Sequence, residues 1–442
     1  MTSGRQRVAL FLPAQAAAET EATILKWYVS TGEDFRKGQI LAEAESAKSS
    51  FQFDAPCSGS VAEILVAEGE TVAFEKPVIE VETDESGVGE RKPVAPPDEG
   101  SKDEHPADVA VVSASGRPGP SSGVGILGIG AYLPQRVVGN KDLLEKFPDV
   151  TEEYIFGVTG IRERRWASPE EKPSDMAFAA ARDAIRASGL KPDDIHGIIV
   201  STTTPDYAMP ATACLLQEKL GIKYVPSFDL NAACSGWLYA LSTAKGLIHS
   251  GLGNNILVVG VDMQSRMLQN TDRSAYFLFG DGAGATVVSD SPKAHVIREE
   301  ILAADSRGLR MARREFPGYE IPENIPDADP WIRLDGRALF KFATESFSSI
   351  VRQVIEKSGW EPTEVKWVVP HQANGRILKA AARKSGVPFE RFYLNIDRVG
   401  NTSSASIPLA LIEVQKFISR SDKLVLCSVG AGITYAAISV EW

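Results

Sequence analysis

The sequence predicts an α/β protein preceded by a small all-β domain, with a flexible linker between them. Three observations support this prediction. An internal repeat occupies residues 1–83, and a stretch rich in Pro, Gly, Ser and charge follows at 84–122. From 123 to the C-terminus, apolar strand patterns alternate with amphipathic helix patterns. This alternation is typical of sheets that are covered by helices on both faces.

The first segment contains two similar halves, because residues 24–35 are echoed by residues 61–72. Gly32-Glu33 and Gly69-Glu70 mark equivalent turns between short alternating strands, which predicts a β-sandwich. Strand character lapses around Lys48, so we expect this lysine at an exposed hairpin tip. The linker should behave as a coil with an end-to-end distance of roughly 35 Å.

Strand and helix patterns after the linker fall into two similar halves, 123–294 and 295–442. In the first half we expect strands at 124–132, 197–202, 225–230 and 255–261, helices at 174–188 and 237–249, and apolar segments at 279–285 and 286–288. In the second half we expect helices at 338–359, 375–385 and 404–419, and strands at 365–369, 423–427 and 433–440.

Composition narrows the class of protein. With 442 residues, 43% hydrophobic and 24% charged, the chain should hold more than one soluble globular unit. Four scattered cysteines predict neither a disulfide framework nor a metal site. A net charge of -11 argues against nucleic-acid binding. We find neither a membrane-spanning run nor a signal-peptide core, so we expect a cytoplasmic protein.

Cys234 is the most informative residue of the chain. Residues 231–237 read Asn-Ala-Ala-Cys-Ser-Gly-Trp, where an apolar strand stops and an apolar helix begins. Unpaired N–H groups at a helix start favour a thiolate. We therefore expect Cys234 to be ionised and able to attack an acyl carbonyl while nearby N–H groups hold the oxyanion.

Two further polar residues stand at comparable junctions. His371 follows the strand at 365–370 and precedes Gln-Ala-Asn-Gly-Arg, and the end of a strand is a usual site position in an α/β fold. Asn401 lies in a Gly-containing loop just before a helix. Taken singly, each has a structural alternative, as a buried core histidine and as a cap or turn residue.

Together these contexts resemble the β-ketoacyl-acyl carrier protein synthase III family, the initiating condensing enzymes of the thiolase superfamily. The resemblance covers about 123–442 and includes the motifs at 159–164, 279–285, 371–374 and 400–403. It implies a thiolase-like fold of two similar βαβαβαββ halves in five αβαβα layers, and a homodimer.

The resemblance also implies a Cys-His-Asn triad at Cys234, His371 and Asn401. Cys234 would take an acyl group from a thioester, and His371 and Asn401 would stabilise the oxyanion formed when a malonyl-type thioester loses CO₂. The backbone N–H groups of Cys234 and Ala431 would form a second oxyanion hole. The expected setting is fatty acid or polyketide-like biosynthesis, with no metal and no cofactor required for catalysis.

The positions that bind the thioester arm differ in part from the family pattern. Arg273 and Asn374 match arm positions, but Tyr154 and Val158 stand where many members hold the adenine of coenzyme A with Trp and Arg. The missing arginine removes a stacking cation. Coenzyme A is therefore expected to be a poor donor, and the sequence leaves open whether the starter arrives on coenzyme A or on the phosphopantetheine of acyl carrier protein. Met209 matches a position that lines the family's acyl pocket.

A basic helix face indicates a protein partner. Arg376, Lys379 and Arg383 share one face of the helix after His371. In an acidic chain, such a stripe suits docking of an acidic partner such as acyl carrier protein. The alternative is an ordinary solvated face.

The N-terminal segment, over residues 5–83, resembles the lipoyl/biotinyl attachment domain. The repeat, Glu-Ser-Ala-Lys at 45–48 and the run at 55–61 carry this resemblance. Lys48 stands at the modified position, and its neighbours Ala47 and Ser49 are closer to the lipoyl pattern than to the biotinyl pattern. Lys48 is thus either a lipoyl attachment site that presents an acyl thioester to Cys234 or an unmodified hairpin lysine.

Three alternatives to decarboxylative condensation stay open. Relatives of this family pass the acyl group to an alcohol or amine without loss of CO₂, or join two ketoacyl chains in specialised metabolism. A third alternative is a non-catalytic carrier or scaffold built around the N-terminal domain. The sequence leaves the starter and extender groups open.

Overall fold

The computed structural model describes residues 6–13, 21–46, 50–85, 123–314 and 330–442. It divides into two compact units, Met1–Asp103 and Glu104–Trp442. Lys48 and nearly all of the expected linker, from 86 to 122, lie outside the described residues.

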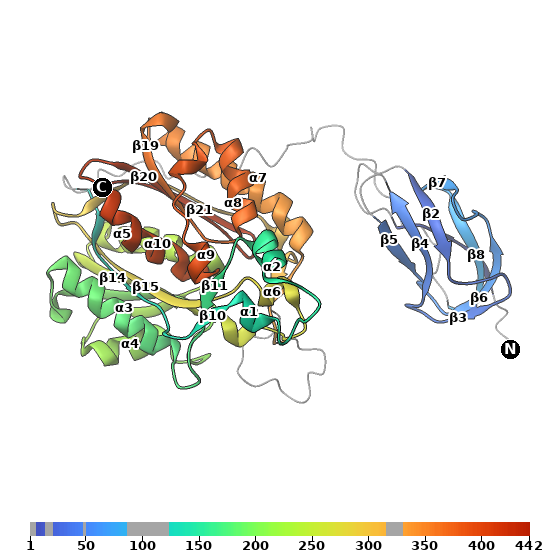
Figure 1. Cartoon of the computed structure of the whole chain (residues 1–442), viewed down its shortest axis with the longest axis horizontal. Coiled ribbons are helices and arrows are strands. Elements are labelled where there is room, and N and C mark those ends of the chain that lie inside the picture. The colour runs from blue at the N-terminus through green and yellow to red at the C-terminus, as the bar shows by residue number, and fades with distance from the viewer. Residues whose placement is uncertain (1–5, 14–20, 47–49, 86–122, 315–329) are drawn as a thin grey trace. The chain divides into compact units, whose positions relative to one another are not determined.

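The N-terminal unit, blue in Figure 1, is a sandwich of two four-stranded antiparallel sheets, in the orders β1-β8-β6-β3 and β5-β4-β2-β7. Its strands are β1 (Gln6–Phe11), β2 (Glu21–Trp27), β3 (Asp34–Phe35), β4 (Ile40–Ser46), β5 (Ser50–Asp54), β6 (Gly59–Ile64), β7 (Thr71–Ala73) and β8 (Pro77–Thr83). This confirms the small all-β domain.

The two repeats of this unit are tied together reciprocally. In the first repeat, the N–H of Gly32 donates to the carbonyl of Val61, which begins the second repeat, at 2.8 Å. In the second repeat, the N–H of Gly69 donates to the carbonyl of Ile24, which begins the first, at 2.7 Å. Both glycines have positive φ, 86° and 83°, which explains why glycine stands at each turn.

The larger unit is built on a nine-stranded sheet with the order β13-β12-β14-β15-β9-β16-β21-β20-β19. These strands are β9 (Gly125–Tyr132), β12 (Gly197–Ser201), β13 (Ser227–Leu230), β14 (Asn255–Met263), β15 (Asp281–Ser289), β16 (His295–Ala304), β19 (Val365–Pro370), β20 (Lys423–Gly430) and β21 (Thr434–Glu441). Two short hairpins accompany the sheet: β10 (Val137–Gly139) with β11 (Glu163–Arg165), and β17 (Ala312–Arg313) with β18 (Arg333–Leu334).

The helices of this unit are α1 (Asn140–Leu143), α2 (Glu152–Thr159), α3 (Pro173–Ser188), α4 (Thr212–Leu220), α5 (Gly236–His249), α6 (Arg273–Tyr276), α7 (Gly336–Lys357), α8 (Gly375–Ser385), α9 (Ile396–Val399) and α10 (Ser406–Val414). None of the helices in the described ranges has the length and apolar character that crossing a membrane requires.

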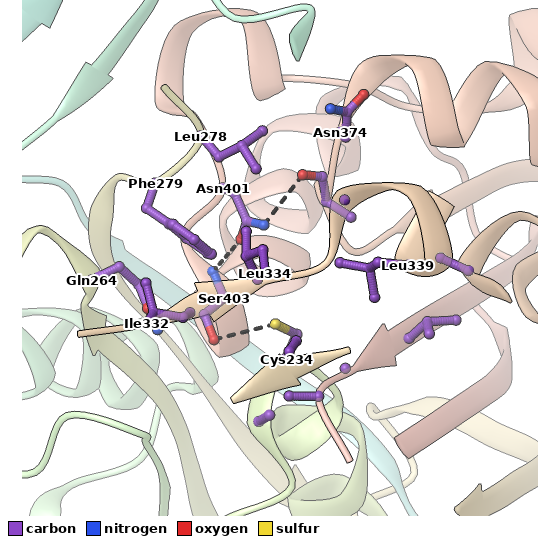
Figure 2. Close-up of a pocket in the computed structure, with 18 of the residues that line it drawn as sticks. Cys234, Gln264, Leu278, Phe279, Ile332, Leu334, Leu339, Asn374, Asn401 and Ser403 are labelled. Carbon is purple, nitrogen blue, oxygen red and sulfur yellow. Dashed lines mark hydrogen bonds between the residues drawn. The ribbon is translucent and has the colours of Figure 1, made fainter. Parts of the chain in front are cut away.

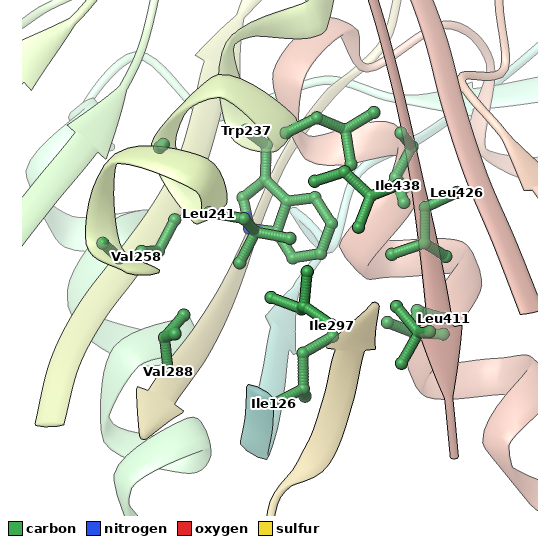
Figure 3. Close-up of a cluster of buried hydrophobic side chains, with 14 of the residues drawn as sticks. Ile126, Trp237, Leu241, Val258, Val288, Ile297, Leu411, Leu426 and Ile438 are labelled. Atoms are coloured by element: carbon green, nitrogen blue, oxygen red, sulfur yellow. The ribbon is translucent and has the colours of Figure 1, made fainter. Parts of the chain in front are cut away.

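The helices and the two parts of the sheet form layers. Helices α3 and α4 cover β12, β14 and β15 on one outer side, and α7 and α8 cover β20 and β21 on the other (Figure 1). Helices α5 and α10 lie in the centre, where the main core surrounds the fully buried Trp237 (Figure 3). The expected five-layer α/β arrangement is therefore present.

Three elements differ from the prediction. The segments expected at 279–285 and 286–288 form one continuous strand, β15. The helix expected at 404–419 is interrupted, since the 3-10 turns η7 (Ser403–Ala405) and η8 (Gln415–Phe417) flank a shorter α10. Strand β16 was not expected, and it meets β9 through two residue pairs.

Candidate active site

Cys234, His371 and Asn401 line one cavity of about 950 Å³ in the larger unit. Cys234 lies in the 3-10 turn η2 (Ala233–Ser235), directly before α5. His371 follows β19, and Asn401 lies between α9 and η7. Figure 2 shows Cys234, Asn401 and Ser403 facing the same space. Side chains from distant parts of the sequence thus meet at the start of the central helices.

The backbone forms the same turn at Cys234 and at Asn401. Ala233 has φ 47° and donates its N–H to Oδ1 of Asn231 at 3.1 Å. Ser403 has φ 51° and donates its N–H to Oδ1 of Asn401 at 2.9 Å. Left-handed backbone is costly for residues other than glycine, and such positions collect at functional sites. A central helix, α5 or α10, begins just after each turn.

Residues of strands β20 and β21 form hydrogen bonds to η2, the turn that contains Cys234. The hydroxyl of Ser428 donates to the carbonyl of Cys234 at 2.9 Å, and that of Ser235 donates to the carbonyl of Thr434 at 3.1 Å. A Cβ at Gly430 would lie 2.9 Å from the backbone nitrogen of Cys234. Only glycine therefore lets the 430–432 turn approach the nucleophile this closely.

The Cys234 thiol is protonated in the resting site. Burial raises its pKa to about 11, and the charge of Asp262 adds to this. The Ser403 hydroxyl, 3.5 Å from Sγ, and hydrogen bonds from the backbone of Cys234 and Ala431 act in the opposite direction, but burial outweighs them. The prediction of a resting thiolate is therefore wrong, because desolvation in the apolar cavity exceeds the effect of the helix start.

His371 is neutral, and a hydrogen bond at its Nδ1 fixes the ring. Its side chain is 1% exposed, and burial lowers its pKa to about 3. Nδ1 lies 3.0 Å from the hydroxyl of Ser406, the first residue of α10. With Ser406 as the donor, the ring proton sits on Nε2, which can then donate a hydrogen bond to a ligand.

Asn401 has a fixed amide orientation. Its Oδ1 accepts the Ser403 N–H, and its Nδ2 donates to the carbonyl of Ala373 at 3.2 Å. The amide has two N–H groups, so one remains for a ligand. His371 and Asn401 can therefore supply two neutral donors.

The predicted arm-binding residues line the cavity, but two of them already have strong partners. Arg273 donates through Nη2 to both carboxylate oxygens of Asp149, at 2.5 Å each. Asn374 accepts the Arg376 N–H at the start of α8 and donates to the carbonyl of Val158 at 3.1 Å. Both hold the walls in place while lining the cavity.

Tyr154 and Met209, which were predicted to contact the substrate, both have exposed side chains. Tyr154 lines the cavity and is 53% exposed. Met209 is 83% exposed and is not among the residues that line this cavity in the single chain. The structure of one chain therefore does not place Met209 in an acyl pocket.

The cationic face of α8 is accessible. Arg376, Lys379 and Arg383 are all exposed, and the Arg376 guanidinium lies 6.0 Å from the centre of the Phe340 ring at the cavity wall. Helix α7 packs against α8, and its first two turns carry the exposed cations Arg337 and Lys341, which were not among the predicted docking residues.

Other residues of the site were also missed. Ser403 and Ser406 belong to a run of small polar residues after Asn401, and this run was the available signal. Asp262 is the penultimate residue of the apolar strand β14, Gln264 follows that strand directly, and both are buried. Within the described ranges, no group of three or more His, Cys, Asp or Glu side chains is placed to hold a metal ion.

Comparison with family models gives three matches. Residues 228–306 match the model described as 3-oxoacyl-[acyl-carrier-protein (ACP)] synthase III, and residues 355–442 match the model of its C-terminal part. Residues 9–81 match the model described as biotin-requiring enzyme. The matches thus fall separately on the two units.

Individual relatives cover the larger unit. The chain is 42% identical over 319 residues to beta-ketoacyl-[acyl-carrier-protein] synthase III 1 of Vibrio vulnificus, which covers 72% of this chain and 99% of the relative. The crystal structure of 3-oxoacyl-[acyl-carrier-protein] synthase III from Aquifex aeolicus is 41% identical with a TM-score of 0.67, covering 72% of this chain and 100% of that one. The priming beta-ketosynthase of the R1128 polyketide pathway is 32% identical with a TM-score of 0.68, covering 74% and 98%.

Proposed function

The chain belongs to the 3-oxoacyl-[acyl-carrier-protein] synthase III family, and from this premise we propose how its own residues carry out the reaction. The protein is an acyltransferase of the condensing-enzyme class, which joins an acyl group to a malonyl-type thioester with loss of CO₂. One observation supports the residue assignments above all: Cys234, His371 and Asn401 line a single cavity.

The first step is acylation of Cys234. Its sulfur attacks the donor thioester, the acyl–sulfur bond to the donor breaks, and the donor leaves as a thiol with the cysteine proton. The N–H groups of Cys234 and Ala431, which reach the sulfur, stabilise the oxyanion of the tetrahedral intermediate. Because the resting thiol is protonated, its ionisation accompanies binding of the donor.

The second step is decarboxylation and condensation. Loss of CO₂ from the malonyl-type thioester places negative charge on its thioester oxygen. The Nε2–H of neutral His371 and the free N–H of Asn401 donate to that oxygen. The carbanion attacks the acyl carbon, a carbon–carbon bond forms, and the Cys234 sulfur leaves and takes up a proton. These steps require no metal and no redox cofactor.

Acyl carrier protein is the proposed partner for both thioesters. The exposed cations of α8, Arg376, Lys379 and Arg383, face solvent near the cavity, where an acidic carrier can dock. Reversing the charge of Lys379 with Lys379→Glu should raise the KM for carrier-bound substrate and leave kcat unchanged. Asp193→Lys, on the exposed 3-10 turn η1 (Pro192–Asp194), is a control that changes charge elsewhere on the unit. An unchanged KM for Lys379→Glu would contradict this docking face.

The N-terminal unit is the proposed carrier of a covalent lipoyl group. Residues 9–81 match the biotin-requiring enzyme model, and Lys48, which lies outside the described residues, is the proposed attachment site. An acyl group on dihydrolipoyl would then reach Cys234 without coenzyme A. Intact mass spectrometry of protein from its native host tests this, with Lys48→Arg as the control. An unmodified mass would leave the unit as a spacing or docking module.

We place the enzyme in the cytoplasm as a homodimer. Strand β13 is at one edge of the sheet, and the exposed Met209 belongs to the same region, between β12 and α4. In a dimer, Met209 would line the acyl pocket of the partner. Light scattering that shows a monomer would contradict this proposal.

The decisive experiment offers a panel of acyl thioesters, on carrier protein and on coenzyme A, together with a malonyl thioester. Mass mapping of the peptide that contains Cys234 should show an acyl adduct, and CO₂ release should match product formation. Acylation without CO₂ release would favour transfer to an alcohol, an amine or a second ketoacyl chain. If Cys234→Ala keeps full product formation, the enzyme assignment of this residue fails and a scaffold role gains support.

A further inference from the structure

Asp262, the penultimate residue of β14, lies behind the catalytic cavity and is fully buried. Each of its carboxylate oxygens accepts one backbone N–H and one hydroxyl at 3.0 Å or less, and Oδ1 also lies 3.4 Å from the hydroxyls of Thr202 and Thr204. Oδ1 accepts the N–H and the Oγ1 of Thr203, both at 2.7 Å. Oδ2 accepts the N–H and the Oγ of Ser404, at 3.0 and 2.7 Å. All four of these donors are neutral.

We propose that Asp262 is a positioning residue of the condensation reaction, which fixes the loop of Asn401 to the opposite wall of the cavity. The inference rests on the proposed function of this site. Ser404 follows Ser403, whose hydroxyl contacts the Cys234 sulfur and whose N–H orients the Asn401 amide. One carboxylate therefore anchors the segment that touches both the nucleophile and the donor amide.

The opposite wall is anchored by the same group. Thr203 and Gln264 both line the cavity, and the Nε2 of Gln264 donates to Oγ1 of Thr203 at 3.0 Å. Because the Thr203 hydroxyl donates to Asp262, its oxygen must accept from Gln264. Movement of the carboxylate would therefore shift this wall and the Asn401 loop together.

The buried charge has a second consequence for the nucleophile. Asp262 is the charged group that raises the pKa of Cys234 in addition to burial, while His371, which also faces the cavity, is neutral. The negative charge disfavours a thiolate before a donor binds. It therefore protects the resting sulfur against alkylation and oxidation by reagents that need the thiolate.

Asp262→Asn tests both consequences with nearly the same shape. One oxygen becomes an NH₂ group, which then faces a backbone N–H that cannot rotate away, so one loop loses its anchor. We expect CO₂ release from a malonyl thioester to fall at least about tenfold. We also expect alkylation of Cys234 by iodoacetamide at pH 8 to become at least about threefold faster, since the repelling charge is gone.

Asp281→Asn is the matched control. Asp281 is equally buried and accepts the N–H groups of Ser265 and Ala167, both at 2.8 Å, but neither of these two partners lines the cavity, whereas Thr203, a partner of Asp262, does. The Asp281→Asn substitution should lower the melting temperature of the protein about as much as Asp262→Asn does. It should leave the alkylation rate of Cys234 within about twofold of the wild type. Ser404→Ala, which keeps the charge, should slow CO₂ release without faster alkylation.

The outcomes separate the two proposals. If Asp262→Asn and Asp281→Asn give the same rates of CO₂ release and alkylation, the positioning role is overturned. If Asp262→Asn does not unfold cooperatively, Ser404→Ala decides, and a wild-type rate of CO₂ release in that variant overturns the inference. If no thioester acylates Cys234 in the wild-type protein, the proposed function itself fails.

Discussion

Replacing Gly430 by alanine should separate the two half-reactions of the enzyme. The new Cβ would lie 2.9 Å from the backbone nitrogens of both Cys234 and Ser235, and 2.8 Å from Oγ1 of Thr434. Real Cβ atoms do not approach this closely, and two of the three neighbours are backbone atoms that cannot rotate away. The cysteine turn must therefore move away from the 430–432 turn.

We expect Gly430→Ala to slow the acylation of Cys234. The proposed oxyanion hole joins the N–H of Cys234 to that of Ala431, so widening it removes one aligned donor. Loss of one such donor lowers the rate by about 10²- to 10³-fold, or about 3–4 kcal/mol. In the proposed mechanism CO₂ release depends on His371 and Asn401 instead, and we expect its rate to stay within about tenfold of the wild type.

The assay measures both steps on the same protein. Rapid quenching with an acyl thioester, followed by mass mapping of the Cys234 peptide, gives the acylation rate, and a malonyl thioester alone gives the rate of CO₂ release. Gly246→Ala in α5 is the control, because nothing lies within 4 Å of its added Cβ and alanine favours a helix by about 0.5–1 kcal/mol. Wild-type acylation in Gly430→Ala, or an equal loss of both steps at an unchanged melting temperature, would refute this assignment of the oxyanion hole.

Three further predictions concern protonation and hydrogen bonding in the site. Ser406→Ala should lower the rate of CO₂ release about 10- to 100-fold, because buried Nδ1 of His371 loses its partner, whereas an unchanged rate would exclude the role of Ser406. The rate of alkylation of Cys234 should keep rising between pH 8 and 10, because the pKa of its thiol is raised to about 11. The exposed Cys214 serves as the internal reference in the same experiment. Because the pKa of the Cys234 thiol is raised in the folded protein, its protonation contributes to the free energy of unfolding below about pH 8.5. This contribution is lost as the pH rises through 11. CO₂ release should show no histidine titration between pH 5 and 8, since His371 stays neutral above about pH 3, and a step near 6.5 would contradict its burial.

The sequence predicted the fold class and the order of most elements because strand and helix periodicity is local. It failed where tertiary contacts decide the residue type. Residues 279–285 and 286–288 were predicted as two segments, but 281–289 form one strand, β15. Its Gly282 and Gly284 are needed because α10 crosses the strand closely, and a Cβ at Gly284 would lie 2.5 Å from the side chain of Pro408.

The site shows the same division between local and tertiary information. The junctions that carry Cys234, His371 and Asn401 could be found from short motifs. The protonation of Cys234 could not, because it depends on burial by segments far away in the sequence and on the charge of Asp262. The partners of His371 and Asn401 likewise emerge only when α10 and the 371–374 loop are packed together.

The equivalent turns before α5 and α10 indicate that the two similar halves of the larger unit contribute different side chains to one reaction. In both, an asparagine ties a left-handed residue two positions on. In the first copy Asn231 ties the turn and lines the cavity, and Cys234, directly after the left-handed Ala233, is the proposed nucleophile. In the second copy Asn401 itself is the proposed hydrogen-bond donor to the substrate. A different reaction can therefore arise in this fold when side chains on these two turns are substituted, while the backbone conformation of the turns is kept.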